Sequence, residues 1–217
     1  MYTKPILVFY HCAISGGPRN IQPDYSLEIV TEQLLLLQTT KLLDAATYVQ
    51  INVNGTKPDV IAVASILPPN AKIMYIWHGD RAVTEIPTLK LLRERALTTD
   101  SYILYFHSKG VSTPGKQINW RRRMELYLIK NSWAECVLFL TKGYDTVGCH
   151  WLTPEQFPAQ IKTPFYGGNF WWARSSYIAT LPELPPDKWN NRYEAEHWIG
   201  LNNPTALDLC PGWPTAD

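Results

Sequence analysis

Short apolar segments alternate along the chain with segments of helical periodicity, and this alternation limits the possible folds more than any other feature. Residues 5–10 (PILVFY) form the first apolar run, and residues 24–45 follow with a leucine-rich helical pattern that begins at Asp24. Buried parallel strands are short, nearly continuous apolar runs of this kind. Strands that alternate with helices favour a mostly parallel sheet with helices on both faces.

The same alternation continues to the end of the sequence. Further strands are predicted at residues 48–53, 72–77, 102–106, 145–149 and 170–173. Further helices are predicted at residues 88–98, directly after Pro87, and at residues 120–140 and 192–200. Residues 59–66 are apolar but match neither pattern. We therefore expect a single α/β domain spanning residues 1–217, with a central sheet of about six strands.

Composition excludes several classes of protein. Hydrophobic residues make up 46% of the 217 residues, which is enough for a full core, and the net charge of +1 argues against a general nucleic-acid binder. No uncharged apolar run is long enough to span a bilayer, and the N-terminus is too polar for a secretory signal. The four cysteines are far apart and form no CxxC pair, which favours reduced thiols without structural zinc. We expect a cytoplasmic protein.

Four of the five histidines directly follow a predicted strand. They are His11, His78, His107 and His150. If these strands are parallel, the histidines gather along the carboxyl edge of the sheet, where open α/β sheets bind ligands. The alternative is that each histidine only marks a strand end, where polar residues are common.

The segment YFHSKG, residues 105–110, places a lysine at one of these strand ends. Lys109 could hold a fixed positive charge against a diphosphate leaving group, and Gly110 would let the backbone approach the phosphates. Lys116 and the three arginines of residues 121–123 follow closely. Consecutive arginines spread around a helix, so at least one of them belongs to a solvated basic face or a helix-start nucleic-acid patch.

Two further motifs hold candidate binding residues. The segment YGGNFWWARSSYIATL, residues 166–181, places Asn169 and Trp171 on one face of a strand, where they either line a cleft or pack in the core. The segment NRYEAEHWIG, residues 191–200, carries Glu194 and Glu196 at a helix start. Either carboxylate could serve as a base near an acceptor hydroxyl, although the helix dipole alone also favours acidic residues there.

Taken in order, these motifs resemble a family of small GT-A-like glycosyltransferases. The resembling segments are YFHSKG, NWRRRMELYLI, YDTVG, GGNFWWARSSYIATL and RYEAEHWIG. The sequence is similar to the rhamnan synthesis protein F type and to the N-terminal glycosyltransferase domain of a large chlorella virus enzyme. The resemblance covers roughly residues 98–200. It implies a GT-A-like, Rossmann-like domain with a nucleotide-binding half at residues 1–100 and an acceptor and catalytic half at residues 101–217.

The resemblance also implies roles for individual residues. The catalytic candidates are His107, Lys109 and Glu196. By the resemblance, His107 and Lys109 face the donor diphosphate, Trp120 and Arg121 hold the loop and the phosphates, and residues 168–172, with Asn169 and Trp171 among them, line the acceptor side. His11 and Gly110, which the strand-end pattern suggests, complete the list of candidate binding residues. Most GT-A enzymes carry Asp-x-Asp at the end of this strand and use it to hold a divalent cation. Because that motif is missing here, a requirement for Mn²⁺ or Mg²⁺ is left open, with His78 and Asp80 as the candidate ligands.

The leading hypothesis is a glycosyltransferase of polysaccharide biosynthesis. It would move a sugar, with rhamnose suggested by the resemblance, from a nucleotide diphosphate-sugar to a glycan or lipid-linked acceptor. One alternative is a metal-dependent hydrolase or phosphoesterase that uses the strand-end histidines, although no HxH or HExxH spacing is present. Another is a glycan-binding module without catalysis, or one module of a larger synthase.

Overall fold

The structure is a computed structural model that describes residues 3–14, 25–67, 73–78, 84–111, 117–131, 133–157, 161–184 and 191–212. The strands are β1 (Ile6–Ala13), β2 (Tyr48–Asn54), β3 (Ile73–His78), β4 (Tyr102–His107), β5 (Thr146–Gly148), β6 (Trp151–Leu152), β7 (Phe165–Tyr166), β8 (Trp171–Arg174) and β9 (Ala206–Asp208). The helices are α1 (Ser26–Thr39), α2 (Leu42–Ala45), α3 (Lys57–Ile66), α4 (Ile86–Ala96), α5 (Ile118–Glu125), α6 (Trp133–Thr141), α7 (Ser175–Ile178) and α8 (Arg192–Trp198), with a π-helical segment η2 (Leu126–Lys130).

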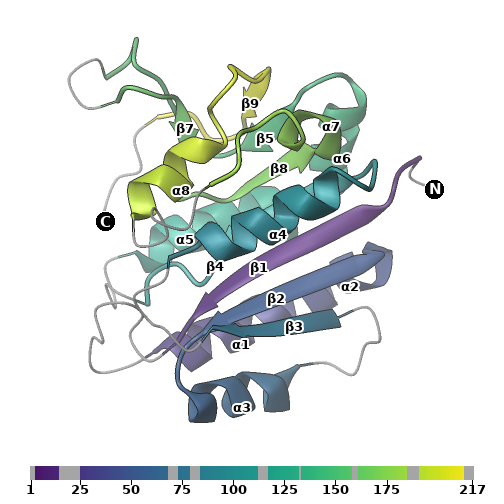
Figure 1. Ribbon diagram of the computed structural model, residues 1–217, viewed down its shortest axis with the longest axis vertical. Helices are drawn as coiled ribbons and strands as arrows, with labels where there is room; N and C mark the ends of the chain where they lie inside the picture. Colours follow the sequence, from purple (N-terminus) through teal and green to yellow (C-terminus); the bar gives the residue numbers. More distant parts are fainter. Residues whose placement is uncertain are drawn as a thin grey trace.

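Seven of the described strands form one mostly parallel sheet in the order β3-β2-β1-β4-β8-β5-β9 (Figure 1). Strand β8 is antiparallel to both β4 and β5, and β6 pairs with β7 in a separate small ribbon. The predicted α/β fold, with a mostly parallel sheet flanked by helices, is confirmed. The main sheet holds seven described strands where about six were expected, because the short strand β9 lacks an apolar run.

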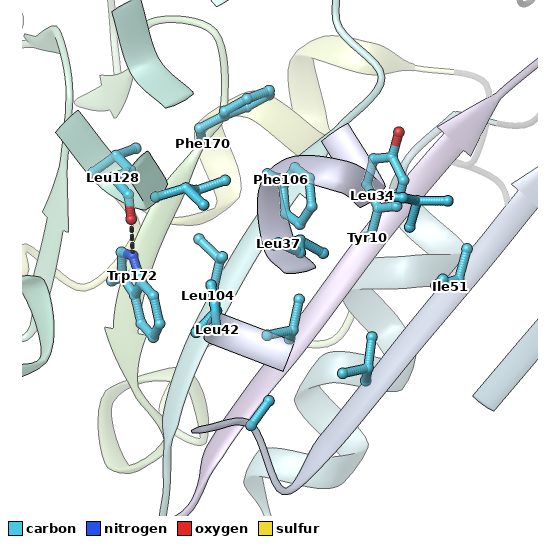
Figure 2. Close-up of a cluster of buried hydrophobic side chains, with 14 of the residues drawn as sticks. Tyr10, Leu34, Leu37, Leu42, Ile51, Leu104, Phe106, Leu128, Phe170 and Trp172 are labelled. Carbon is cyan, nitrogen blue, oxygen red and sulfur yellow. Dashed lines mark hydrogen bonds between the residues drawn. The ribbon is translucent and has the colours of Figure 1, made fainter. Parts of the chain in front are cut away.

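Helices cover both faces of the sheet, as the alternation of side chains along each buried strand requires. On one face, Val8 and Tyr10 of β1 and Phe106 of β4 pack among α1, α2, α3 and the α5–η2–α6 segment. Figure 2 shows part of this core, where the Trp172 indole N–H donates a hydrogen bond to the Leu128 carbonyl at 2.9 Å. On the other face, Phe9 packs beneath α4, α7 and α8 in a second core.

In the first third of the chain, one helix prediction was wrong in detail and one unassigned segment is a helix. The segment predicted as one helix over residues 24–45 is interrupted at Lys41, whose φ of 62° ends α1 and begins α2. The apolar residues 59–66, which matched neither pattern, belong to α3. That helix starts with a capping box, in which the backbone N–H of Thr56 donates to Asp59 Oδ2 at 2.7 Å.

The long helix predicted over residues 120–140 is divided into three parts. Helix α5 passes into η2, where the backbone N–H of Asn131 bonds to the Leu126 carbonyl, five residues earlier, at 3.1 Å. A separate helix, α6, then begins at Trp133. Buried apolar residues continue through all three parts, so the hydrophobic period does not reveal the wider turn. π-helical turns of this kind are rare and are frequent at functional sites.

The topology places the strand-end histidines along one edge of the sheet. His11 of β1 is the register partner of His107 in β4, and His78 of β3 pairs with Asn54. Strand β5 runs parallel to β4, since both are antiparallel to β8, so His150 follows β5 at the same edge. The expectation that these positions share the carboxyl edge is confirmed for their backbones.

Two expectations from composition can also be compared with the structure. All four cysteines are buried and unpaired, as expected for reduced thiols. Among the helices in the described ranges, none combines the length and the hydropathy that a bilayer crossing requires.

Gly200 lies two residues after the end of α8, where the chain packs closely against Pro164. A Cβ atom at Gly200 would lie 1.6 Å from the carbonyl oxygen of Pro164, so the backbone would have to move. We expect Gly200→Ala to lower the free energy of unfolding by roughly 3 kcal/mol or more, measured by urea denaturation.

Gly143→Ala is the matched control for this prediction. Its φ of 108° disfavours a side chain, but no heavy atom lies within 4 Å of the added Cβ. The control should therefore cost only about 1–2 kcal/mol, which is the backbone cost alone. Equal losses in the two variants would show that the contact with Pro164 does not determine the packing of α8.

Candidate functional site

The turn that follows β4 is fixed by hydrogen bonds to β1. The Ser108 side-chain oxygen accepts from the backbone N–H of Ala13 at 2.8 Å, and the backbone N–H of Ser108 donates to the His11 carbonyl at 2.9 Å. Gly110 has a φ of 101°, which glycine adopts without strain. These contacts make the chain turn sharply after His107 and leave Lys109 buried at the carboxyl edge of the sheet.

Lys109 is a buried cation without a hydrogen-bonded partner in the described part of the chain. The residue is only 6% exposed, and its Nζ lies 3.7 Å from the centroid of the Trp120 ring. Burial lowers the pKa of Lys109 to about 8, an effect that the negative charges of Glu196 and Glu85 partly oppose. At neutral pH the ammonium group is therefore mostly charged, and this position favours an anionic ligand.

His107 lies beside Lys109 but stays neutral. Burial, with a further contribution from the Lys109 charge, lowers its pKa to about 3. Its Nε2 donates a hydrogen bond to the Gly168 carbonyl at 2.9 Å, and its Nδ1 lies 3.7 Å from Glu85 Oε1. Because the imidazole is neutral, the contact with Glu85 is not an ion pair at neutral pH. His107 therefore orients the Gly167–Asn169 turn and adds no positive charge to the site.

Glu85 is a site residue that the sequence did not indicate. It directly precedes α4, and its Oε2 accepts hydrogen bonds from Asn169 Nδ2 at 2.6 Å and from the Tyr105 hydroxyl at 3.0 Å. Asn169 has a φ of 57°, and its Oδ1 accepts from the Trp171 indole at 2.8 Å. The one available signal was a carboxylate before the Ile86–Pro87 helix start, which the helix dipole explains equally well.

Glu196 reaches the same region from α8. Its Oε1 accepts a hydrogen bond from Arg192 Nη2 at 2.5 Å, one helical turn earlier, and its side chain is 14% exposed. The negative charge of Glu196 raises the pKa of Lys109, which places the two groups within electrostatic range. The predicted catalytic residues His107, Lys109 and Glu196 are therefore brought to one part of the sheet edge.

His11 is part of a chain of buried polar side chains beneath α4. Its Nδ1 lies 2.9 Å from the hydroxyl of Thr88, and that hydroxyl accepts a hydrogen bond from Asn52 Nδ2 at 2.8 Å. Asn52 accepts in turn from Gln50 at 3.0 Å. Thr88 was not indicated by the sequence, because a threonine within the first turn of a helix is unremarkable by pattern. The chain of contacts holds the His11 ring in place at the sheet edge.

The Trp120 ring lies close to both Lys109 and Gly168. Gly168 has a φ of 93°, and a Cβ atom there would lie 2.7 Å from Met124 Sδ and 3.2 Å from Trp120 Cε2. A glycine is therefore required on both steric and backbone grounds. The Trp120 indole N–H is buried, and none of the described residues accepts a hydrogen bond from it. Trp120 lies beside Lys109, and its predicted contact with the donor stays a prediction.

Other predicted binding residues lie elsewhere. Arg121 is 3% exposed and forms ion pairs with Glu32 at 2.7 Å and Glu125 at 3.0 Å, so its guanidinium joins α1 to α5. Trp171 is fully buried in the second core, with its ring centroid 5.0 Å from that of Tyr105. Among the described contacts, none joins either side chain to Lys109, and their predicted contact with a ligand stays a prediction.

The candidate metal ligands fall outside what the structure describes. Asp80 lies in residues 79–83, outside the described ranges, and only the backbone of His78 is described. Within the described ranges, no three His, Cys, Asp or Glu side chains are grouped so that they could hold a metal ion. The expectation of a divalent cation at His78 and Asp80 therefore stays a prediction.

Comparisons with known proteins add a family and several similar structures. The model of the family described as a domain of unknown function, DUF8361, matches residues 9–197. No curated protein sequence matches the chain.

Three solved structures illustrate the likeness. The structure of HddC from Yersinia pseudotuberculosis is 7% identical, with 97% of this chain and 91% of that chain covered and a TM-score of 0.47. For Rv0371c from Mycobacterium tuberculosis H37Rv the identity is 12%, the coverages are 98% and 91%, and the TM-score is 0.46. For 4-diphosphocytidyl-2C-methyl-D-erythritol synthase the identity is 13%, 96% of this chain and 90% of that chain are covered, and the TM-score is 0.36.

The neutral state of His107 leads to a prediction about acid stability. Its pKa is about 3 in the folded chain and near 6.5 when exposed, so the unfolded chain binds more protons in between. Stability from this group is present above pH 6.5 and is lost as the pH falls, by up to about 1.4 kcal/mol per pH unit. We expect the free energy of unfolding of His107→Gln, from urea denaturation, to fall less steeply between pH 6.5 and 4.5.

Glutamine can still donate a hydrogen bond to the Gly168 carbonyl but does not titrate. All other titrating groups are shared by the two proteins, so the difference between their pH profiles isolates His107. Parallel profiles would mean that His107 is not held neutral by the fold.

Proposed function

We propose that this chain, which belongs to the DUF8361 family, is a glycosyltransferase that moves a sugar from a nucleotide diphosphate donor to a glycan or lipid-linked acceptor. The observation that carries the proposal is the buried ammonium group of Lys109 at the carboxyl edge of the sheet, which has no ion-pair partner among the described residues. A buried cation without a carboxylate partner is costly to the fold and suited to an anionic ligand. A diphosphate is an anion that can satisfy it.

Lys109 would act on the leaving group. As the bond between the anomeric carbon and the diphosphate oxygen breaks, negative charge builds up on that oxygen, and a fixed ammonium group stabilises it in a site of low dielectric. Gly110, with its positive φ, allows the backbone after Lys109 to approach the phosphates closely. In this role the lysine supplies the electrostatic stabilisation that most GT-A enzymes obtain from a divalent cation.

Glu196 is the base that we propose for the acceptor. The acceptor hydroxyl oxygen would form the new bond to the anomeric carbon while Glu196 takes up the hydroxyl proton and the diphosphate leaves with its electron pair. The hydrogen bond from Arg192 fixes the orientation of the carboxylate and leaves its second oxygen free to receive the proton. Glu85, which already accepts from Tyr105 and Asn169, would position the Asn169 turn.

The two alternative functions have less support. A metal-dependent hydrolase needs converging ligands, and within the described ranges no suitable group of three is found. A glycan-binding module has no need of a buried cation, because neutral sugars are recognised by stacking and hydrogen bonds. Neither alternative explains why Lys109 is buried beside Trp120.

The direct test is calorimetric titration with UDP, GDP and dTDP, each with and without Mn²⁺. We expect one nucleoside diphosphate to bind, and we expect Lys109→Ala to weaken its binding by roughly 10–100-fold through the loss of a charge-assisted contact. The dependence on Mn²⁺ shows whether a cation takes part as well.

Lys142→Ala is the matched control, since Lys142 is exposed at the end of α6, and it should bind as the wild type does. Failure of all three nucleotides to bind under both conditions would overturn the proposal. Unchanged binding by Lys109→Ala would overturn the role of Lys109.

The buried charge also predicts a gain in stability when it is removed. The pKa of Lys109 is about 8 in the folded chain and 10.5 when exposed, so the unfolded chain binds more protons between these values and wild-type stability rises with pH there. At pH 7, Lys109→Met should be more stable than the wild type, by on the order of 1–3 kcal/mol in urea denaturation.

This advantage of Lys109→Met should shrink as the pH rises from 8 to 10.5, because folded Lys109 loses its proton in this range while the unfolded chain keeps it. Above that range Lys109 is neutral in both states and the advantage should be gone. Lys142→Met should show neither effect. A Lys109→Met protein that is less stable than the wild type at pH 7 would show that the ammonium group has a stabilising partner.

A further inference from the structure

His150 has an unused hydrogen-bond acceptor. It follows β5 at the sheet edge, is 2% exposed, and has a φ of 59°, which is unusual for a residue other than glycine. Its Nδ1 lies 2.9 Å from the Gly212 carbonyl oxygen. A carbonyl can only accept, so Nδ1 carries the proton and Nε2 has the lone pair. Nε2 is buried and has no hydrogen-bond partner within the part of the chain that the structure describes.

The neighbouring Trp120 has the complementary feature. Its ring lies edge-on to that of His150, with 6.4 Å between centroids, and its indole N–H is also buried without a partner. The Lys109 ammonium group lies over the same indole, 3.7 Å from its centroid. A buried acceptor on His150 and the buried cation of Lys109 therefore lie against one tryptophan ring, and that ring carries a buried donor of its own.

The chemistry of the two unpaired atoms restricts what can satisfy them. Burial lowers the pKa of His150, so Nε2 stays an acceptor at neutral pH and needs a donor from the ligand. A phosphate oxygen without a proton could accept from Trp120 or Lys109, but it has nothing to donate to His150. A hydroxyl group both donates and accepts. The group that fits is thus a hydroxyl held next to an anion, as in a sugar diphosphate.

We propose that His150 and Trp120 form a subsite for a hydroxyl group of the donor's sugar, next to the diphosphate at Lys109. This inference rests on the proposed function and adds a residue that selects the donor sugar. Buried polar groups seldom lack partners in folded proteins, and two of them at one ring indicate a place where a ligand supplies the bonds. His150 would accept the sugar O–H, and Trp120 would donate to the sugar or the diphosphate.

Two substitutions separate the nitrogen atoms of His150. In His150→Asn the side-chain amide takes the place of Nδ1, keeps the bond to Gly212, tolerates the positive φ, and removes Nε2. In His150→Gln the longer side chain can place its carbonyl oxygen where Nε2 was and restores the acceptor. The pair therefore tests the acceptor and not only the volume of the side chain.

The experiment measures calorimetric affinities for UDP, GDP and dTDP and for their conjugates UDP-glucose, GDP-mannose and dTDP-rhamnose. For the nucleotide that the wild type binds, we expect a conjugate to bind more tightly than the free diphosphate. His150→Asn should weaken conjugate binding about tenfold, while affinity for the free diphosphate changes less than about twofold. His150→Gln should recover most of the loss. Trp120→Phe, which keeps a ring beneath Lys109, should weaken conjugate binding in the same direction.

The possible failures can be told apart. If the wild type binds none of the nucleoside diphosphates, the proposed function falls and this inference falls with it. If the wild type binds a nucleoside diphosphate but His150→Asn binds the conjugate equally well, only the subsite is overturned, and a buried water is then the partner of His150. A conjugate that binds no more tightly than the free diphosphate, or an equal loss for both ligands in His150→Asn, overturns the subsite too.

Discussion

Burying the ammonium group of Lys109 costs folding free energy, because hydration is lost and no ion pair within the described ranges replaces it. The surrounding structure is arranged to hold the charge despite this cost. The Ser108 turn is bonded to β1, and Trp120 presents the face of its ring to the cation. The carboxylates of Glu196 and Glu85 favour the charged form from a distance without contacting it. The ammonium group therefore stays available to a ligand.

Neutrality of the neighbouring histidines is the second condition for such a site. If His107 or His150 carried a proton at neutral pH, each would repel the Lys109 ammonium group and lower its pKa further. Burial keeps both imidazoles neutral, and each uses one nitrogen to bond a backbone carbonyl, of Gly168 and Gly212 respectively. The positive charge is thus concentrated at one atom, and the neighbouring polar groups serve for orientation.

The sequence predicted the sheet and the residues at its carboxyl edge well, because buried strands and the residues that follow them have a local pattern. His107, Lys109 and Glu196 were indicated by such patterns. Glu85 and Thr88 were not, since they stand at an ordinary helix start and only the packing of α4 brings them to β4 and β1. The resemblance assigned Arg121 to the donor; its ion pair with Glu125 is local, one turn along α5, whereas its ion pair with Glu32 depends on the packing of α1 against α5.

The reversed direction of β8 has a consequence for how the protein matures. Because β8 runs antiparallel between β4 and β5, the Gly167–Asn169 turn that precedes it reaches the same edge as Lys109. A chain that has been synthesised through Lys109 still lacks this turn, His150 and Glu196. The turn can reach the edge beside Lys109 only after β8 has been synthesised and has paired, and Glu196 follows later with α8, so the elements around Lys109 are assembled by contacts between distant parts of the chain.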